Sequence, residues 1–214
     1  MKLVMLSDQH NNSEMLDRRI RELFKSHNTF LGYIPSQPDY DKRYFNAAKP
    51  YFDQLGFKNF VYYDIDKQYN ESLTEDIFQC DAIHLSGGNT FYFLNCLKGT
   101  GMLSELRRYA INGGVLIGIS AGSIMMAKDI AMASYIDENE IALQDLDSMN
   151  LVDFHFMPHW KNEAPLTEKL KSHSQTGDHV IYACPDGGGI VLDGGEMDFF
   201  GDIYEFRDGF KAKR

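Results

Sequence analysis

Short apolar runs alternate with longer amphipathic segments along most of the chain. The runs contain six or seven residues and are rich in β-branched and aromatic side chains, which is typical of buried strands. They predict strands over residues 2–7, 29–35, 60–65, 82–87, 115–120 and 179–184. Between most of them, apolar residues recur at helical spacing and predict helices over residues 12–27, 42–55, 71–79, 90–98 and 102–112. This alternation favours a three-layer α/β sandwich with a mostly parallel central sheet and right-handed crossovers.

The pattern changes after residue 184. The stretch GIVLDGGEMDFFGDIYEFRDG, residues 189–209, contains short apolar pieces separated by Asp-Gly and Gly-Gly pairs, which are typical of antiparallel hairpins. We therefore expect the sheet to end in an antiparallel C-terminal meander. No internal repeat or linker interrupts the chain, and 214 residues with 43% hydrophobic content suit a single domain spanning residues 1–214.

Charge and cysteine content exclude several function classes. The formal net charge is −10 and no basic run is present, which argues against a nucleic-acid partner, because that binding requires clustered Lys and Arg. The apolar run at the N-terminus is too short for a signal peptide, and no run approaches the roughly 20 apolar residues of a membrane span. We expect a cytoplasmic protein with no membrane partner. The three cysteines lack metal-ligand spacing and predict reduced thiols in or near the core.

A candidate nucleophile lies in the stretch GGVLIGISAGSIMMA, residues 113–127. Its apolar run breaks at Gly118, Ser120 and Gly122, which match the G-x-S-x-G pattern of a nucleophile elbow. In such an elbow the small flanking residues let the backbone turn sharply, so that the serine hydroxyl is exposed where the strand ends. The helix that follows offers unpaired N–H groups to a developing oxyanion. The alternative interpretation is an ordinary turn in which Ser120 caps a helix.

A second glycine-containing loop follows the strand predicted at residues 82–87. In AIHLSGGNTFYFLNCL, Gly87 and Gly88 precede a helix that Asn89 or Thr90 caps. Glycine lets a backbone N–H approach a ligand closely because no Cβ intervenes. Gly88 and Ala121 could therefore supply the two N–H groups of an oxyanion hole, although an ordinary capped turn would have the same sequence.

A nucleophilic serine needs an imidazole base and an acid that orients it. Among the seven histidines, His155 ends an apolar run in LVDFHFMPHW and is our predicted base, with His159 as its nearest rival. His84 lies inside a predicted strand and is expected to be a core residue. Asp186 follows the strand at 179–184 and is our candidate acid, although Asp before Gly also forms turns. Three further histidines are expected to be solvated: His27, His173 and His179.

Four segments in this order, LSGGNTFYFL, IGISAGSIMMA, DFHF and ACPDGG, resemble peptidase family S51, the family of dipeptidase E and cyanophycinase. The resemblance covers nearly the whole chain and implies a fold similar to class I glutamine amidotransferases, with serine in place of their cysteine. It implies that Ser120 is the nucleophile and His155 the base. Asp186 matches a position where dipeptidase E carries a glutamate.

The resemblance also assigns residues around the nucleophile. Gly88 and Ala121 match the oxyanion-hole positions, and Asn89 and Thr90 match an Asn-Thr pair beside the substrate. The chain departs from dipeptidase E at an aspartate important for activity, where Tyr135 stands and the nearest acid is Asp137. The arginine that would pair with a substrate aspartate also has no match, because the corresponding region reads Pro165, Leu166 and Thr167.

These observations predict a serine peptidase that hydrolyses small peptides through an acyl-enzyme, with no metal and no cofactor, and without strict specificity for aspartate. Two alternatives stay open. An esterase or amidase of the α/β-hydrolase type carries the same elbow, but its chain order is Ser, acid, His. A non-catalytic binding domain of amidotransferase-like fold would have no imidazole within reach of Ser120. The sequence leaves the oligomeric state open.

Overall fold

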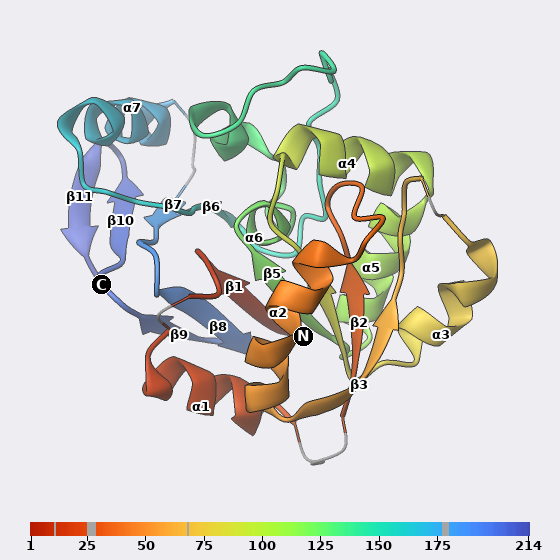
Figure 1. Cartoon of the computed structure of the whole chain (residues 1–214). Helices are drawn as coiled ribbons and strands as arrows, with labels where there is room; N and C mark the ends of the chain where they lie inside the picture. Colours follow the sequence, from red (N-terminus) through yellow and green to blue (C-terminus); the bar gives the residue numbers. More distant parts are fainter. Residues whose placement is uncertain (11, 25–28, 68, 177–179) are drawn as a thin grey trace.

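Two β-sheets organise the chain, and helices pack on both faces of the larger one (Figure 1). The computed structural model describes residues 1–214 except 11, 25–28, 68 and 177–179. The larger sheet has seven strands in the order β3-β2-β4-β5-β1-β8-β9. Its strands are β1 (Lys2–Leu6), β2 (Thr29–Ile34), β3 (Phe57–Tyr62), β4 (Ala82–Leu85), β5 (Val115–Ile119), β8 (Gly189–Asp193) and β9 (Glu196–Phe200).

The first five strands of the chain pair in parallel, as their alternation with helices predicts. Parallel strands need crossover connections, which here are helices buried on one side against the sheet. These are α1 (Glu14–Glu22), α2 (Arg43–Leu55), α3 (Thr74–Phe78), α4 (Thr90–Gly99) and α5 (Met102–Ile111). The bounds predicted at 42–55, 90–98 and 102–112 agree closely, and 71–79 divides into a 3₁₀ turn, η1 (Glu71–Leu73), and α3. The helix predicted at 12–27 is shorter in the structure, since α1 ends at Glu22, and residues 25–27 of that prediction lie outside the described residues.

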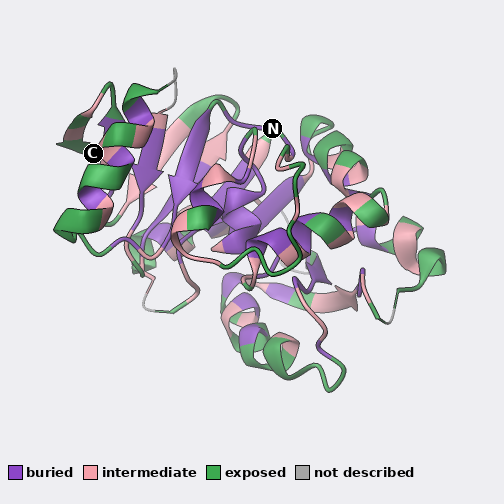
Figure 2. Cartoon of the chain, turned by 90° about the horizontal axis from the view of Figure 1, so that it is seen from above, coloured by how far each residue is buried: buried purple, intermediate pink, exposed green. Residues whose placement is uncertain are grey.

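The two faces of the sheet carry separate apolar clusters. On one face, Leu16 and Ile20 of α1 and Phe52 of α2 are fully buried against the strands. On the other, α4 and α5 bury Phe93 and Leu106 in the larger cluster. Burying side chains of this size stabilises the fold by about 1.5–3 kcal/mol each. Figure 2 shows the resulting layers, with buried strands between partly exposed helices.

The smaller sheet has four strands in the order β11-β10-β7-β6. They are β6 (Phe154–Met157), β7 (Val180–Ala183), β10 (Tyr204–Arg207) and β11 (Phe210–Lys213), and α7 (Ala164–Gln175) packs against them. Two expectations were therefore wrong. The strand predicted at 179–184 belongs to this sheet, and only β8 and β9 of the predicted meander extend the larger one. An apolar run indicates a strand, but its pairing partners depend on tertiary contacts.

The carboxyl ends of β1, β4 and β5 meet at one edge of the larger sheet, because these strands are parallel neighbours. Loops from such an edge commonly form ligand sites in α/β folds. A short helix, α6 (Ala121–Ile124), directly follows β5 at this edge, and a 3₁₀ turn, η2 (Ala131–Tyr135), comes after it. Within the described part of the chain, no helix is long and apolar enough to cross a membrane.

Candidate active site

Ser120 occupies a strained turn between β5 and α6. Its φ of 50° and ψ of −107° lie outside the common regions for a residue with a side chain. The glycines on either side are needed for packing, because a Cβ on Gly118 would lie 2.5 Å from backbone atoms of Gly122. A Cβ on Gly122 would lie 2.1 Å from the carbonyl oxygen of Leu85. The G-x-S-x-G sequence thus folds as the predicted sharp turn, with Ser120 partly exposed.

Ser120, His159 and Asp186 form a continuous hydrogen-bonded chain. The Nε2 atom of His159 lies 2.9 Å from Ser120 Oγ, and its Nδ1 atom lies 2.7 Å from Asp186 Oδ1. An ionised carboxylate only accepts hydrogen bonds, so Nδ1 carries the proton and Nε2 accepts the serine hydroxyl. The His159 side chain is 40% exposed and that of Asp186 is 50% exposed, which leaves the chain accessible to substrate and water.

The structure places His159, rather than the predicted His155, beside Ser120. His155 lies within β6 and is 3% exposed, with Nδ1 3.8 Å from Asp129 Oδ1 and its ring against that of His173. β6 continues to Met157, so His155 lies within the strand and is enclosed by its neighbours. His159 instead follows the end of β6, where it adopts a positive φ of 55°, and its side chain reaches Ser120.

The other histidines differ in environment. His84 is 1% exposed, with Nδ1 3.0 Å from the Ile117 carbonyl oxygen, so the expectation of a core histidine is confirmed. Burial lowers its pKa to about 3. His173 is partly buried with Nδ1 3.1 Å from the Tyr135 hydroxyl, so the expectation that it is solvated was wrong. His27 and His179 lie outside the described residues.

The loop after β4 presents Gly88 close to Ser36. Gly88 has a φ of 147°, and a Cβ there would lie 2.1 Å from Ser36 Oγ, so only glycine fits. Ser36 N donates to Ser86 Oγ, and Ser36 Oγ donates to the Gly87 carbonyl, which holds the loop in place. Among the described residues, neither the Gly88 nor the Ala121 backbone N–H makes a hydrogen bond.

Asn89 and Thr90 hold this loop through hydrogen bonds within the protein. Asn89 Oδ1 accepts from Tyr92 N as the cap of α4, and its Nδ2 donates to the Glu138 carbonyl. Thr90 is fully buried, and both its N–H and its hydroxyl donate to Asp137 Oδ2. Both side chains thus have partners within the protein, and their contact with substrate stays a prediction. Asp137, which the sequence offered only as the nearest acid, anchors the loop.

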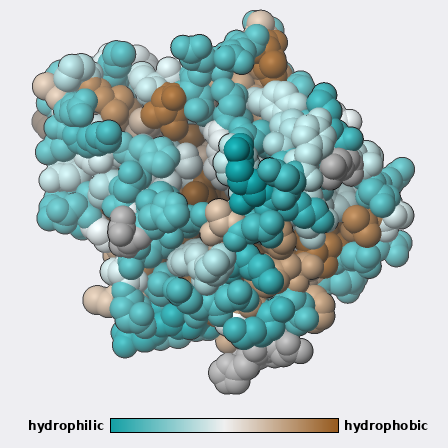
Figure 3. All heavy atoms as spheres, viewed as in Figure 1, coloured by the Kyte–Doolittle hydropathy of each residue, from teal (hydrophilic) through white to brown (hydrophobic). Residues whose placement is uncertain are grey.

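Beside Ser120 and His159 lies a cleft of about 410 Å³. It is lined by the ends of β1, β2 and β4 and by α2, with Tyr33, His84 and Ile119 among its apolar walls. Burial raises the pKa of Tyr33 and lowers that of His84, so both rings are uncharged. Asp8 is the one carboxylate among its described lining residues, which include no Lys or Arg. Figure 3 shows that the face of the molecule seen in this view is mostly hydrophilic.

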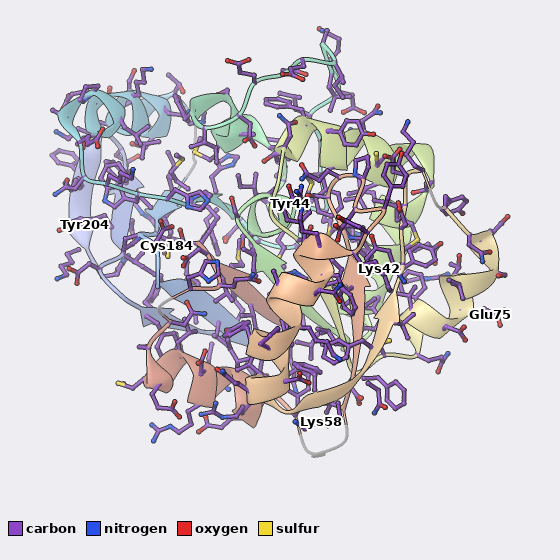
Figure 4. The ribbon with its side chains drawn as sticks, in the orientation of Figure 1. Lys42, Tyr44, Lys58, Glu75, Cys184 and Tyr204 are labelled. Atoms are coloured by element: carbon purple, nitrogen blue, oxygen red, sulfur yellow. The ribbon has the colours of Figure 1, made fainter. Side chains whose placement is uncertain are left out.

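An arginine stands near this cleft without lining it. Arg43, at the start of α2, lies over the Tyr44 ring, and its Nη2 donates to the Tyr44 hydroxyl at 2.8 Å. Tyr44 does line the cleft, and Figure 4 labels it at the start of α2 beside Lys42. Sequence reasoning missed Arg43 because it is remote along the chain from the segment where a substrate-binding arginine was sought.

Two residues at the end of β1 contact the turn that carries Asp186. Ser7 Oγ donates to Asp186 Oδ1 at 2.9 Å, and Asp8 Oδ1 accepts from Gly187 N at 2.7 Å. Neither residue belongs to a motif that the sequence reveals. The one signal for them in the sequence is that Ser7 and Asp8 are a polar pair directly after the apolar run in KLVMLSDQ.

Comparison with known proteins identifies relatives over most of the chain. The family model for peptidase family S51 matches residues 3–200. An uncharacterized peptidase of Listeria monocytogenes is 30% identical over 158 residues, 72% of this chain and 76% of that protein. Peptidase E of a Nostoc species is 30% identical over 131 residues, 59% of this chain and 53% of that protein.

Solved structures have the same fold. A crystal structure of a candidate peptidase E protein from Listeria monocytogenes superimposes with a TM-score of 0.77 and 25% identity, covering 92% of this chain and 96% of that chain. A peptidase from an acI-B1 Actinobacterium superimposes with a TM-score of 0.73 at 15% identity, covering 100% of this chain and 93% of that chain. The second likeness concerns the fold alone.

Proposed function

Since the chain belongs to peptidase family S51, we propose that it is a serine peptidase whose triad is Ser120, His159 and Asp186. The observation that carries the proposal is the imidazole of His159, which bridges the Ser120 hydroxyl and the Asp186 carboxylate at 2.9 and 2.7 Å. Three side chains from separate loops in this order match the roles of nucleophile, base and orienting acid.

The proposed reaction proceeds in two stages. Ser120 Oγ attacks the peptide carbonyl carbon while His159 Nε2 takes the hydroxyl proton, and Asp186 stabilises the imidazolium that forms. When the tetrahedral intermediate collapses, the C–N bond breaks and His159 donates its proton to the leaving amine. A water molecule then attacks the acyl-enzyme, giving one proton to His159, which returns it to Ser120 as the acid product leaves.

Gly88 and Ala121 are the proposed donors to the oxyanion. The glycine at position 88 keeps its N–H accessible, and Ala121 N–H belongs to the residue directly after the nucleophile, as in other elbow enzymes. Removing one such donor from an enzyme costs about 10²–10³ in kcat. Asn89, Thr90 and Asp137 support this role indirectly because their hydrogen bonds fix the loop that presents Gly88.

The alternatives account less well for the geometry. A non-catalytic binding domain predicts no imidazole near the elbow serine, yet His159 Nε2 lies 2.9 Å from Ser120 Oγ. An α/β-hydrolase esterase predicts the order Ser, acid, His, whereas the chain order here is Ser120, His159, Asp186. The three cysteines are poor candidates for the nucleophile, since burial raises the pKa of all three thiols, to about 11 for Cys80 and Cys96.

Covalent labelling tests the proposed nucleophile directly. A fluorophosphonate probe reacts only with a serine that a base activates, so we expect mass spectrometry to find the adduct on Ser120. Ser123 offers an internal comparison, because it lies three residues away but is fully buried and donates to the Leu6 carbonyl. Unlabelled protein, or an adduct on another serine, would contradict the proposal.

The cleft also predicts which substrates are accepted. A buried substrate carboxylate needs a cation, and among the described residues no Lys or Arg lines the cleft. In a panel of dipeptides that differ only in the first residue, we expect Asn, Ala or Leu to give kcat/KM values equal to or above that of Asp. A preference for Asp beyond about 100-fold, roughly 2.7 kcal/mol, would overturn this expectation. Repeating the panel with Arg43→Gln would then show whether Arg43 supplies the cation.

A further inference from the structure

The hydroxyl of Ser7 makes hydrogen bonds to two members of the proposed triad, Asp186 and His159. Ser7 is fully buried at the end of β1, and its Oγ donates to Asp186 Oδ1 at 2.9 Å. The same oxygen accepts the backbone N–H of His159 at 2.8 Å. A hydroxyl has one proton and two lone pairs, so both bonds are made at once. Ser7 thus contacts the side chain of the acid and the backbone of the base.

His159 needs such a contact because its backbone is strained. Its φ of 55° lies in the left-handed region, which costs about 1–3 kcal/mol for a residue with a side chain unless the surroundings hold it. The described hydrogen bonds that hold this segment are His159 N to Ser7 Oγ and Trp160 N to the Cys184 carbonyl. Without the Ser7 hydroxyl, the His159 N–H would lose its acceptor.

The turn that carries Asp186 is fixed to the same strand end. Ser7 N donates to the Gly188 carbonyl at 3.1 Å, and Asp8 Oδ1 accepts from Gly187 N at 2.7 Å. The Asp186 side chain is itself 50% exposed, so little packing restrains it. Ser7 Oγ and His159 Nδ1 both contact the same oxygen, Oδ1, which sets the direction from which the carboxylate meets the imidazole.

We infer that Ser7 is a positioning residue, which aligns His159 and Asp186 for proton transfer without touching the substrate's reacting atoms. This inference rests on the proposed function and adds a fourth side chain to the site. Catalytic groups must be held in a near-attack geometry, and a displacement of about 1 Å can cost roughly 100-fold in rate. Ser7 is the described side chain that connects both of these groups to the rigid central sheet.

The test is Ser7→Ala, assayed with an accepted dipeptide and with the fluorophosphonate probe. We expect kcat and the labelling rate to fall about 10- to 100-fold, while KM changes little, because Ser7, although it lines the cleft, is fully buried and its hydroxyl is occupied by Asp186 and His159. Ser7→Thr, which keeps the hydroxyl, is expected to recover most of the lost rate. Should Ser7→Ala fail to fold, Ser7→Cys retains the volume with a weaker donor and acceptor and gives the same comparison.

Ser174→Ala is the matched control. Ser174 is 1% exposed, donates to the Lys171 carbonyl and accepts Gly209 N–H, so it has the same burial and bonding as Ser7 but lies in α7. We expect Ser174→Ala to lower the melting temperature by as much as Ser7→Ala does, or by more, and yet to keep the wild-type kcat. The inference is wrong if Ser7→Ala retains wild-type kcat, or if both variants lose activity only in proportion to unfolding. A wild-type protein that neither labels nor hydrolyses peptides would refute the proposed function instead.

Discussion

Ser120→Ala is expected to lower kcat/KM for peptide hydrolysis by about three or more orders of magnitude while leaving the fold intact. The substitution removes one partly exposed oxygen, and the positive φ at this position is as accessible to alanine as to serine. Loss of the attacking oxygen removes the acyl-enzyme route entirely. Steady-state kinetics would measure the loss of kcat/KM, and circular dichroism would check that the fold is intact.

Ser123→Ala serves as the control for removing a hydroxyl near the elbow. The Ser123 hydroxyl donates to the Leu6 carbonyl, which also accepts Ser120 N–H at 2.9 Å and therefore keeps a partner in the variant. Its activity is expected to stay within a few-fold of wild type. Comparable turnover by wild type and Ser120→Ala would mean that another group carries the reaction, and the serine-peptidase proposal would be abandoned.

His159→Ala is expected to abolish labelling of Ser120 and to reduce hydrolysis by about 10³-fold or more, because the hydroxyl loses the base 2.9 Å away. His155→Ala is expected to keep labelling within about tenfold per folded molecule, since His155 is buried in β6. His155→Ala is expected to lower the stability of the fold, because it leaves a cavity. The measurement is the labelling rate of each variant, normalised to the folded fraction from thermal melts.

Asp186→Asn provides an intermediate case. The amide keeps the shape of the side chain but can stabilise the wrong imidazole tautomer, so we expect a rate between those of the two histidine variants. If His155→Ala were inactive and His159→Ala active, His155 would be the base, as the sequence predicts, and the contact between His159 and Ser120 would have no catalytic role.

The fold was predictable where the information is local. Apolar runs located the five parallel strands, although the one predicted at 60–65 lies at Phe57–Tyr62, and their alternation with helices indicated the parallel part of the sheet. The strand β6 and the helix α7 were not predicted. Pairing was not predictable for the later strands, because β7 and β8 have similar apolar sequences but enter different sheets. The likeness to class I glutamine amidotransferases stays a prediction.

The candidate site divides in the same way. Residues 118–122 specify their own sharp turn, because glycine at 118 and 122 is what allows the backbone to pack on itself. The choice between His155 and His159 depends instead on where β6 ends relative to the sheet edge. His155 and His159 are only four positions apart, yet His155 lies inside the smaller sheet and His159 lies beside Ser120.

The sequence by itself determined the parallel strands and their helices, the sharp turn at Ser120 and the loops that carry Gly88 and Asp186, because each follows from steric and apolar patterns within a few neighbouring residues. Only the tertiary structure decided which histidine meets the serine and that Ser7 supports it. Those contacts join residues 39 positions apart, for His159 and Ser120, and 179 positions apart, for Ser7 and Asp186. Their geometry is set by the order in which distant strands pair, which brings together loops that no short stretch of sequence contains.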